Sequence, residues 1–579
     1  MARSRFNKLV GYFRPHWKQA TAGVVALLLV NVFGVAIPLL ISEGIDDLTV
    51  TFSYRQVLQY GGLIGLLASA MWVMRMASRI WLFGMGRQVE FDLKQSIFEH
   101  LLTLEPAYFA NNTAGELISR ATSDVDNIRR LLGFAILSLA NTLFAYTLTL
   151  PVMISINFRL TVVAVLVYPV MLVLVQIFGD RLRDEQLEVQ EQISDLSRLI
   201  QEDMSGIALI KIYAQEANER RAFGDRNQDL LRANLALART RNILFPLLGG
   251  LASISLLTVL AMGAGAIING AITVGEFVAM LLYVERLVFP TALLGFTITA
   301  YQRGEVSIAR VEEILMAEPK ISSPTAQPLG RVQGQVSARH LSYTFPGSTT
   351  PVLQDVSFII EPGQIVAIVG PIGSGKSTLA NALPRLLDIG PNQLFIDGQD
   401  VTALSLQDLR GAIAFVPQDS FLFSTTIENN IRYGKPETAL RQTVSAAHQA
   451  QIAGEIDTFP QQYDTIVGER GITLSGGQRQ RTALARSLVV DAPILVLDDA
   501  LASVDNQTAT AILHSLTAGT QRKTVIFISH QMSAAAAADH ILVMNRGKIV
   551  QSGDHESLVQ QPGLYQRLWD QHKLEEVLG

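Results

Sequence analysis

Six long apolar stretches in the first 300 residues constrain this chain more than any other feature of its sequence. They lie at about 21–41, 60–80, 131–155, 160–178, 243–267 and 274–300. Each stretch has the roughly 20 residues that a helix needs to cross the hydrocarbon core of a bilayer. We therefore expect an all-α membrane domain over residues 1–315, and an even number of spans leaves both of its ends on the same side of the membrane.

The polar connections between the apolar stretches indicate which side is cytoplasmic. Long segments rich in Arg and Lys follow the second and the fourth stretch, at 87–130 and 180–241. The short connection that contains Glu43, Asp46 and Asp47 is acidic. Because basic loops tend to stay in the cytoplasm, we predict a multi-pass membrane protein with both termini in the cytoplasm.

The two long polar segments show helical periodicity, so we expect them to continue the membrane helices into the cytoplasm. Local helix breakers predict turns near 109–116 and 206–216. The sequence leaves open whether these turns transmit motion to another domain or only connect helices.

Few ionisable residues occur within the predicted spans: Arg75 and Arg79 in the second, and Glu285 and Arg286 in the sixth. Charged side chains are costly in hydrocarbon and usually face a cavity or a partner. Arg79 is near the end of its span, from which a long side chain can reach the interface. Glu285 lies nearer the middle, so we predict that it lines a substrate cavity; an interhelical ion pair is the alternative.

Composition excludes several kinds of protein and site. The net charge of −5 argues against a nucleic-acid partner, since such proteins are usually basic. The chain has no cysteine, which excludes disulfides, thiolate metal sites and cysteine nucleophiles. The apolar spans instead predict contact with membrane lipids.

A different pattern follows a predicted linker at 316–334, where residues 335–579 read as an α/β domain. The sequence IVAIVGPIGSGKSTL combines a buried strand, a G-x-x-x-x-G-K-S loop and a helix start. Its candidate ligand-binding residues are Gly370, Gly373, Ser374, Gly375, Lys376, Ser377 and Thr378. Glycines let backbone N–H groups surround phosphates, the lysine reaches the outer phosphates and the serine can ligate Mg²⁺. The motif therefore predicts ATP and Mg²⁺ as ligands.

A second buried strand, ILVLD, ends in Asp498 and is followed by Asp499. A carboxylate at the C-terminal edge of a parallel strand is placed to hold nucleotide-bound Mg²⁺. The next side chain is the natural position for an acid that orients the attacking water, and there an ATPase is expected to carry glutamate. Aspartate is one methylene shorter, and a misplacement of about 1 Å costs about a hundredfold in rate. We therefore expect this site to bind ATP well and hydrolyse it slowly.

The segment LSGGQRQR provides a second anion site at a helix start, formed by Ser475, Gly476, Gly477 and Gln478. It is too far from Lys376 to serve the same phosphate within one domain, so two such domains must meet head to tail. With six spans before one nucleotide domain, the chain resembles ABC exporter half-transporters of the type IV fold over essentially its full length. The resemblance implies a membrane domain of six helices with long cytoplasmic extensions, followed by an α/β phosphate-loop nucleotide-binding domain.

The same resemblance implies roles for residues in shorter motifs. These residues are Tyr343, Gln418, Glu469, Asp505 and His530. Tyr343 is expected to stack on adenine, although a tyrosine of this kind is often a core residue. Gln418 is expected to contact Mg²⁺, Glu469 to lie beside the signature, Asp505 to lie at the interface of the two nucleotide domains, and His530 to contact the γ-phosphate.

Asp499 departs from the family pattern and resembles the degenerate-site subunits of bacterial heterodimeric multidrug exporters. The intact signature would then serve the working site of a different subunit that carries the usual glutamate. We therefore expect ATP-driven export of drugs or lipids by the degenerate half of a heterodimer. The alternatives are a homodimeric lipid or peptide exporter, and an ATP-gated channel or regulator that transports nothing.

Overall fold

The computed structural model describes residues 11–12, 14–50, 52–322, 328–502, 504, 508–509, 511–512 and 522–578. The chain divides into two compact units. One, here called the helical unit, consists of Met1–Leu102 and Ala114–Ala317, and the other, the α/β unit, consists of Thr103–Thr113 and Glu318–Gly579.

Long helices build the helical unit, and six of them are long and apolar enough to cross a membrane. In chain order its main helices are α2 (Trp17–Val50), α3 (Tyr54–Leu101), α5 (Ala114–Ser119), α6 (Val125–Arg130), α7 (Ile136–Ile156), α8 (Phe158–Val165), α9 (Val167–Ser205), α10 (Ile207–Ile212), α11 (Glu216–Ile268) and α12 (Val274–Leu315). Two π-helical turns, η2 (Arg120–Asp124) and η3 (Leu131–Ala135), join α5, α6 and α7 into one continuous span.

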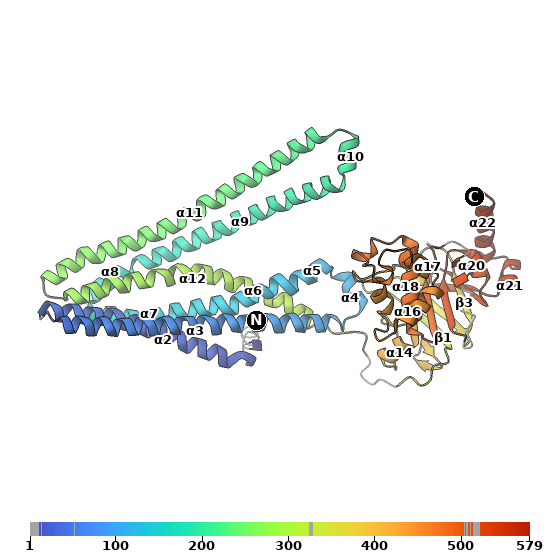
Figure 1. Cartoon of the computed structure of the whole chain (residues 1–579), viewed down its shortest axis with the longest axis horizontal. Helices are drawn as coiled ribbons and strands as arrows, with labels where there is room; N and C mark the ends of the chain where they lie inside the picture. The colour runs from blue at the N-terminus through green and yellow to red at the C-terminus, as the bar shows by residue number, and fades with distance from the viewer. Residues whose placement is uncertain are drawn as a thin grey trace. The chain divides into compact units, whose positions relative to one another are not determined.

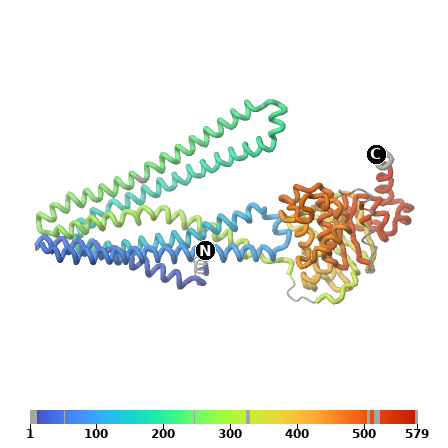
Figure 2. The backbone as a smooth tube through the Cα atoms, in the orientation of Figure 1, coloured from blue at the N-terminus to red at the C-terminus, as the bar shows by residue number. Residues whose placement is uncertain are grey.

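The helices continue well beyond the apolar stretches. Figure 2 shows α2 and α3 running side by side, and α9 and α11 form a hairpin that diverges from them (Figure 1). Short helices occupy the predicted turns: α4 (Pro106–Asn111), which belongs to the α/β unit, and α10 at the tip of the hairpin.

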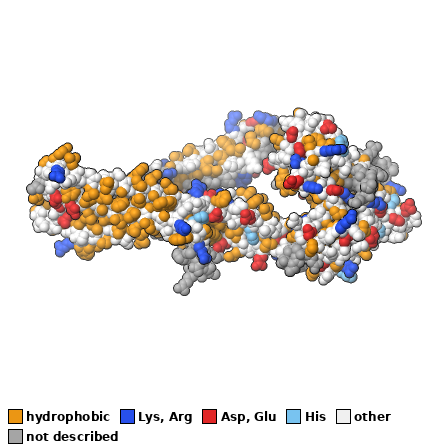
Figure 3. Space-filling view, turned by 60° about the horizontal axis from the view of Figure 1, so that its bottom comes forward, with side chains coloured by type: hydrophobic (Ala, Val, Ile, Leu, Met, Phe, Trp, Pro, Cys, Tyr) orange, Lys and Arg blue, Asp and Glu red, His pale blue; other side chains and the backbone are white. Residues whose placement is uncertain are grey.

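Hydrophobic side chains cover much of the helical unit, whereas charged side chains are scattered over the α/β unit (Figure 3). Exposed apolar residues are typical of a surface that contacts lipid, because hydrocarbon replaces water as the solvent there.

Two sheets form the α/β unit. The smaller has the order β2-β1-β4-β5, with β1 (Val336–Tyr343), β2 (Leu353–Ile360), β4 (Leu394–Ile396) and β5 (Gln399–Asp400) all antiparallel. The larger has the order β10-β9-β3-β8-β7-β6, with β3 (Ile365–Val369), β6 (Ile413–Val416), β7 (Ile494–Asp498), β8 (Thr524–Ile528), β9 (His540–Asn545) and β10 (Lys548–Gly553). Its strands are parallel except for β10, which pairs antiparallel with β9.

Helices complete the α/β unit around these sheets. They are α13 (Lys376–Ala382), α14 (Leu406–Ala412), α15 (Ile427–Arg432), α16 (Leu440–Gln449), α17 (Ala453–Ile456), α18 (Gly476–Val490), α20 (Met532–Ala536), α21 (His555–Gln560) and α22 (Leu564–Leu578). Alternate side chains of the central strands enter two separate cores: Leu495 and Leu497 pack on one face, and Ile494 and Val496 on the other. Burial of both faces explains why β3 and β7 read as continuous apolar runs.

Candidate functional site

A tight loop between β3 and α13 holds the glycines of the G-x-x-x-x-G-K-S motif. Gly370, Gly373 and Gly375 have φ angles of 151°, 79° and 99°, which residues with side chains rarely adopt. Space is also limited at Gly370, where an added Cβ atom would lie 2.2 Å from the carbonyl oxygen of Met544. The loop can therefore curl tightly and end at Gly375, the N-cap of α13.

Lys376 is anchored inside this loop. Its Nζ atom donates hydrogen bonds to the carbonyl oxygens of Gly370, at 2.8 Å, and Pro371, at 3.0 Å. Burial lowers the pKa of Lys376, while the negative charges of Asp499 and Asp498 act in the opposite direction. The loop thus holds one ammonium group within the field of two carboxylates from the end of β7.

Ser377 and Asp498 bring two oxygen ligands together. Ser377 Oγ donates a hydrogen bond to Asp498 Oδ1 at 2.9 Å, which joins the first turn of α13 to the end of β7. Asp498 is 3% exposed. Burial raises its pKa and the charge of Asp499 adds to the rise, whereas the Ser377 hydrogen bond and the charges of Lys376 and His530 lower it.

The donor set at Ser377 and Asp498 suits one kind of metal. The described residues contain no group of three His, Asp or Glu side chains that could hold a metal ion alone. Mg²⁺ is commonly bound by one or two protein oxygens together with substrate phosphates. These two side chains therefore fit a Mg²⁺ ion that arrives with a nucleotide.

Asp499 has an unusual backbone and an unsatisfied side-chain atom. Its φ is 50°, a left-handed conformation that aspartate tolerates better than most residues. Its N–H group donates to the carbonyl oxygen of Ile528 at 3.1 Å. The Oδ1 atom is buried and has no hydrogen-bond partner within the described part of the chain. Because such an atom is costly to bury, it is a ready acceptor for water or ligand beside Asp498.

His530 and Gln418 come from two further loops. His530 lies exposed just after β8, the strand that pairs with both β3 and β7. Gln418, after β6, lines an open groove of about 850 Å³ together with Glu469 and Gly476. Among the described residues, no hydrogen bond joins Gln418 to Ser377 or Asp498.

The signature segment begins α18 with a reciprocal cap. Ser475 Oγ accepts from the N–H of Gln478 at 3.2 Å, and Gln478 Oε1 accepts from the N–H of Ser475 at 2.8 Å. Glu455 of α17 accepts from Gln478 Nε2 at 2.8 Å and pairs with Arg481 at 2.6 Å. The cap and its neighbours fix the N-terminus of a helix whose positive dipole end favours an anion.

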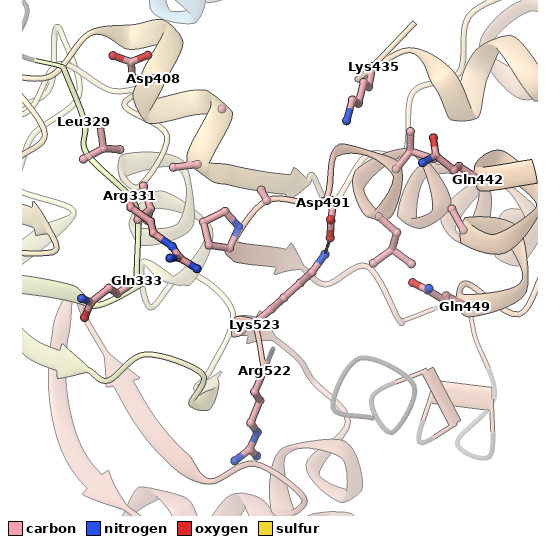
Figure 4. A pocket seen from close by; sticks show the side chains of 18 of the residues that line it. Leu329, Arg331, Gln333, Asp408, Lys435, Gln442, Gln449, Asp491, Arg522 and Lys523 are labelled. Atoms are coloured by element: carbon pink, nitrogen blue, oxygen red, sulfur yellow. Dashed lines mark ion pairs between the residues drawn. The ribbon is translucent and has the colours of Figure 1, made fainter. Parts of the chain in front are cut away.

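A hollow of about 1450 Å³ in the α/β unit lies away from the predicted nucleotide site (Figure 4). It is lined by Ala412, Pro493 and Lys523, which precede β6, β7 and β8. The phosphate loop follows β3, and these four strands are parallel. The hollow therefore lies at the opposite edge of the sheet from the phosphate loop.

In the helical unit, Glu285 is exposed on α12. None of the hydrogen bonds or ion pairs of the described residues involves it, so the alternative of an interhelical ion pair has no support in the structure. Its neighbour Arg286, in contrast, donates to Asn31 of α2.

Comparison with known proteins assigns the two units to one family. Residues 21–291 match the ABC transporter transmembrane region, and residues 353–502 match the ABC transporter domain model. Over 99% of its length, the chain is 33% identical to the probable multidrug resistance ABC transporter ATP-binding/permease protein YheI of Bacillus subtilis, of which it covers 98%. The chain belongs to the ABC transporters. It is an exporter half-transporter.

Other relatives support the same assignment of this half-transporter. It is 32% identical to the multidrug resistance-like ATP-binding protein MdlA of Escherichia coli, over 99% of this chain and 97% of that protein. It is 31% identical to the ATP-dependent lipid A-core flippase of Thiobacillus denitrificans, over 98% of both chains. A structure of a bacterial Atm1-family ABC exporter with ATP bound superimposes with a TM-score of 0.78 at 26% identity, over 96% of this chain and 98% of that one.

Family membership confirms the predicted fold and enzyme class. The half-transporter has six long membrane-spanning helical segments followed by an α/β ABC nucleotide-binding domain. It is an ABC ATPase that binds ATP and couples its ATPase activity to transport. It belongs to a family of multi-pass bacterial exporters. A half-transporter works as a dimer, so this chain requires a second half-transporter as its partner.

One predicted contact residue is placed differently from expectation. Tyr343 is 7% exposed and packs in the core formed by β1 and β2, so its ring offers little surface to a ligand. Phe345, two residues later, is 42% exposed and meets Tyr343 edge-on at 5.2 Å. The alternation of side chains along β1 could have predicted this burial, because Leu341 and Tyr343 are two residues apart and both point into the core. Phe345, beyond the strand end, therefore presents the more exposed aromatic ring, and the sequence argument did not single it out.

The remaining predicted residues are partly within and partly outside the described chain. Ser374 is 2% exposed and Thr378 is half-buried, and both lie in or just after the phosphate loop. Asp505 lies outside the described residues. Glu455, which sequence reasoning did not identify, supports the signature through Gln478, and no short motif marks it.

Proposed function

We propose that this half-transporter exports hydrophobic or amphipathic compounds, drugs or lipids, across the bacterial cytoplasmic membrane by alternating access, with both termini in the cytoplasm. Its relatives include proteins named for multidrug resistance and for lipid A-core flipping, and both kinds of cargo are amphipathic. The apolar surface of the six spans supports such cargo.

ATP would bind with its phosphates against the N–H groups of Gly370–Thr378 and its outer phosphates near Lys376. Mg²⁺ would be held by Ser377 and Asp498, with Gln418 approaching on closure, and would neutralise charge on the phosphates. Ser475, Gly476, Gly477 and Gln478 would contact the nucleotide bound by the partner, and Asp505 would lie near that interface.

Asp499 and His530 would act on the attacking water and the γ-phosphate. The buried, unpaired Oδ1 atom of Asp499 supports a role in orienting water. Its side chain is one methylene shorter than the glutamate that the family expects, so we infer slow hydrolysis at this site.

The single observation that carries this proposal is the pairing of Asp499 with an intact signature helix in one chain. It favours a heterodimer in which this subunit forms the weak site with its own phosphate loop and lends Ser475 to the partner's strong site. The likeness to proteins named lipid A-core flippases favours the second candidate, a homodimeric lipid exporter.

ATPase activity of the chain purified alone distinguishes the two candidates. We expect turnover that is at least about tenfold slower than that of the co-purified pair, since a poorly placed base costs about 10²- to 10⁴-fold. Size-exclusion chromatography with light scattering reports whether the chain dimerises by itself. Fast turnover by a homodimer would rule out the heterodimer and leave the exporter function intact.

Nucleotide affinity should depend on Phe345. We expect Phe345→Ala to weaken ATP binding by about 1–3 kcal/mol, the usual loss when an aromatic ring no longer stacks on a base. Titration with a fluorescent ATP analogue measures the change. Tyr343→Ala is the matched control: it should lower thermal stability, as expected for a buried aromatic residue, more than Phe345→Ala does. If Phe345→Ala binds ATP with the same affinity as wild type, Phe345 does not stack on the adenine ring.

A further inference from the structure

A polar network joins three membrane helices of the helical unit, α2, α7 and α12. Arg286 of α12 donates from its NH2 group to Asn31 Oδ1 of α2 at 3.0 Å and to the Asn31 carbonyl oxygen at 3.1 Å. Asn31, which is 2% exposed, donates in turn to Asn141 Oδ1 of α7 at 3.1 Å and to the Leu27 carbonyl oxygen at 3.0 Å. The network therefore fixes the direction of the Arg286 side chain.

The packing of α2 makes room for this cation. At Gly34, one turn from Asn31, an added Cβ atom would overlap the Arg286 guanidinium group. Arg286 lies about 18 Å along α12 from Val274, near the middle of a hydrocarbon core about 30 Å thick. Both α2 and α12 are thus shaped around a charge deep within the membrane span.

Within the described part of the chain, no hydrogen bond or ion pair joins Arg286 to a carboxylate. In the part of the chain that the structure describes, its hydrogen bonds go to neutral acceptors, and its Nε atom is buried without a partner. Glu285 is the neighbouring residue on α12 but forms no ion pair with it.

A cation within the membrane that lacks a protein counter-charge indicates a site for an anionic ligand. Charged residues within spans cost free energy and mark substrate pathways or partners, and arginine is suited to carboxylate and phosphate because its donors form a planar fork. If the cation were purely structural, a carboxylate on α2 or α7 would stabilise it better than a neutral amide. The sequence instead has Asn31 and Asn141 at these positions.

We propose that Arg286, oriented by Asn31, binds the acidic head group of an amphipathic substrate. The acidic group is a carboxylate or a phosphate ester, which share the oxygen acceptors that a guanidinium recognises. The inference rests on the proposed export function and narrows its substrate to anionic amphiphiles. Cationic amphiphiles are disfavoured at this site by the same positive charge.

Matched amphiphiles test the head-group preference. The transporter, in the assembly in which it purifies, is reconstituted into vesicles, and ATP-dependent movement is measured for fluorescent acyl-chain probes that carry a phosphate, a carboxylate, an uncharged or a quaternary ammonium head group. We expect wild type to half-saturate with an acidic probe at a concentration at least about tenfold below that for the uncharged probe, as for one charged hydrogen bond. Preference for phosphate over carboxylate, or the reverse, identifies which acidic head group is bound.

Three variants separate binding from structure. Arg286→Gln should remove the preference while transport of the uncharged probe persists, and Arg286→Lys should restore part of it. Arg79→Gln removes a guanidinium from α3 outside the network and should behave as wild type. Asn31→Ala, which frees the guanidinium, should weaken binding of acidic probes with less effect on the uncharged one.

Each outcome has a definite meaning. If wild type moves the uncharged and acidic probes equally well, or if Arg286→Gln keeps the acidic preference, the inference is wrong and the export function stands. If wild type moves none of the probes although ATP hydrolysis and folding are intact, the proposed export function itself fails. Loss of all transport in Arg286→Gln, with Arg286→Lys equally inactive, would show a structural role and overturn the inference.

Discussion

Lengthening one side chain, by Asp499→Glu, is expected to raise ATP hydrolysis at this site about tenfold to a hundredfold. The Asp499 carboxylate already has a buried and unpaired oxygen beside Asp498, so the environment for a water-orienting acid exists. An extra methylene moves the carboxylate toward the nucleotide by about 1 Å, and rates respond to displacements of that size about a hundredfold. The left-handed backbone at this position, with φ at 50°, suits glutamate less well than aspartate and limits the gain.

Initial rates of phosphate release check this expectation. If a second subunit co-purifies, its own catalytic acid is first replaced by the amide, so that only this site is measured. Asp499→Asn is the matched control, because it keeps the length of aspartate and removes the charge; it should hydrolyse more slowly than wild type and bind ATP at least as well. Hydrolysis that is unchanged in Asp499→Glu, with normal ATP binding, would contradict the idea that side-chain length limits this site.

Much of the architecture follows from the sequence because its signals are local and repeated. Apolar stretches of about 20 residues are expected to form helices in a bilayer, and the described residues contain six helices long and apolar enough to span one. The phosphate loop can also be predicted from the sequence. Glycines at fixed spacing before Lys376 and Ser377 are typical of the one backbone conformation that this loop adopts.

The sequence failed where burial depends on tertiary context. Tyr343 and Phe345 are both aromatic and only two residues apart, and the strand end between them decides which ring is exposed. The role of Glu285 as a cavity-lining acid stays a prediction: its side chain is exposed on α12, whereas the neighbouring Arg286 belongs to the polar network. Asn31 and Asn141 carry no recognisable motif, so only the packing of α2, α7 and α12 relates them to Arg286.

Two glycine substitutions test whether close packing of the phosphate loop is required for ATP binding. Gly370→Ala is expected to weaken ATP binding more than about a hundredfold. The new methyl group would lie 2.2 Å from the Met544 carbonyl oxygen, and neither backbone can yield without disturbing β3 or β9. A displaced Gly370 also withdraws the carbonyl oxygen that holds Lys376 Nζ at 2.8 Å.

Gly373→Ala is the matched control for that substitution, because Gly373 lies in the same loop with a positive φ of 79° but has open space around an added Cβ atom. It incurs only backbone strain, about 1–2 kcal/mol, and so roughly a tenfold loss of affinity. Titration with a fluorescent ATP analogue ranks the variants, and circular dichroism with thermal unfolding verifies that each is folded. If the folded Gly370→Ala protein binds ATP as tightly as Gly373→Ala, close packing against Met544 does not control the loop, and backbone conformation alone accounts for its glycines.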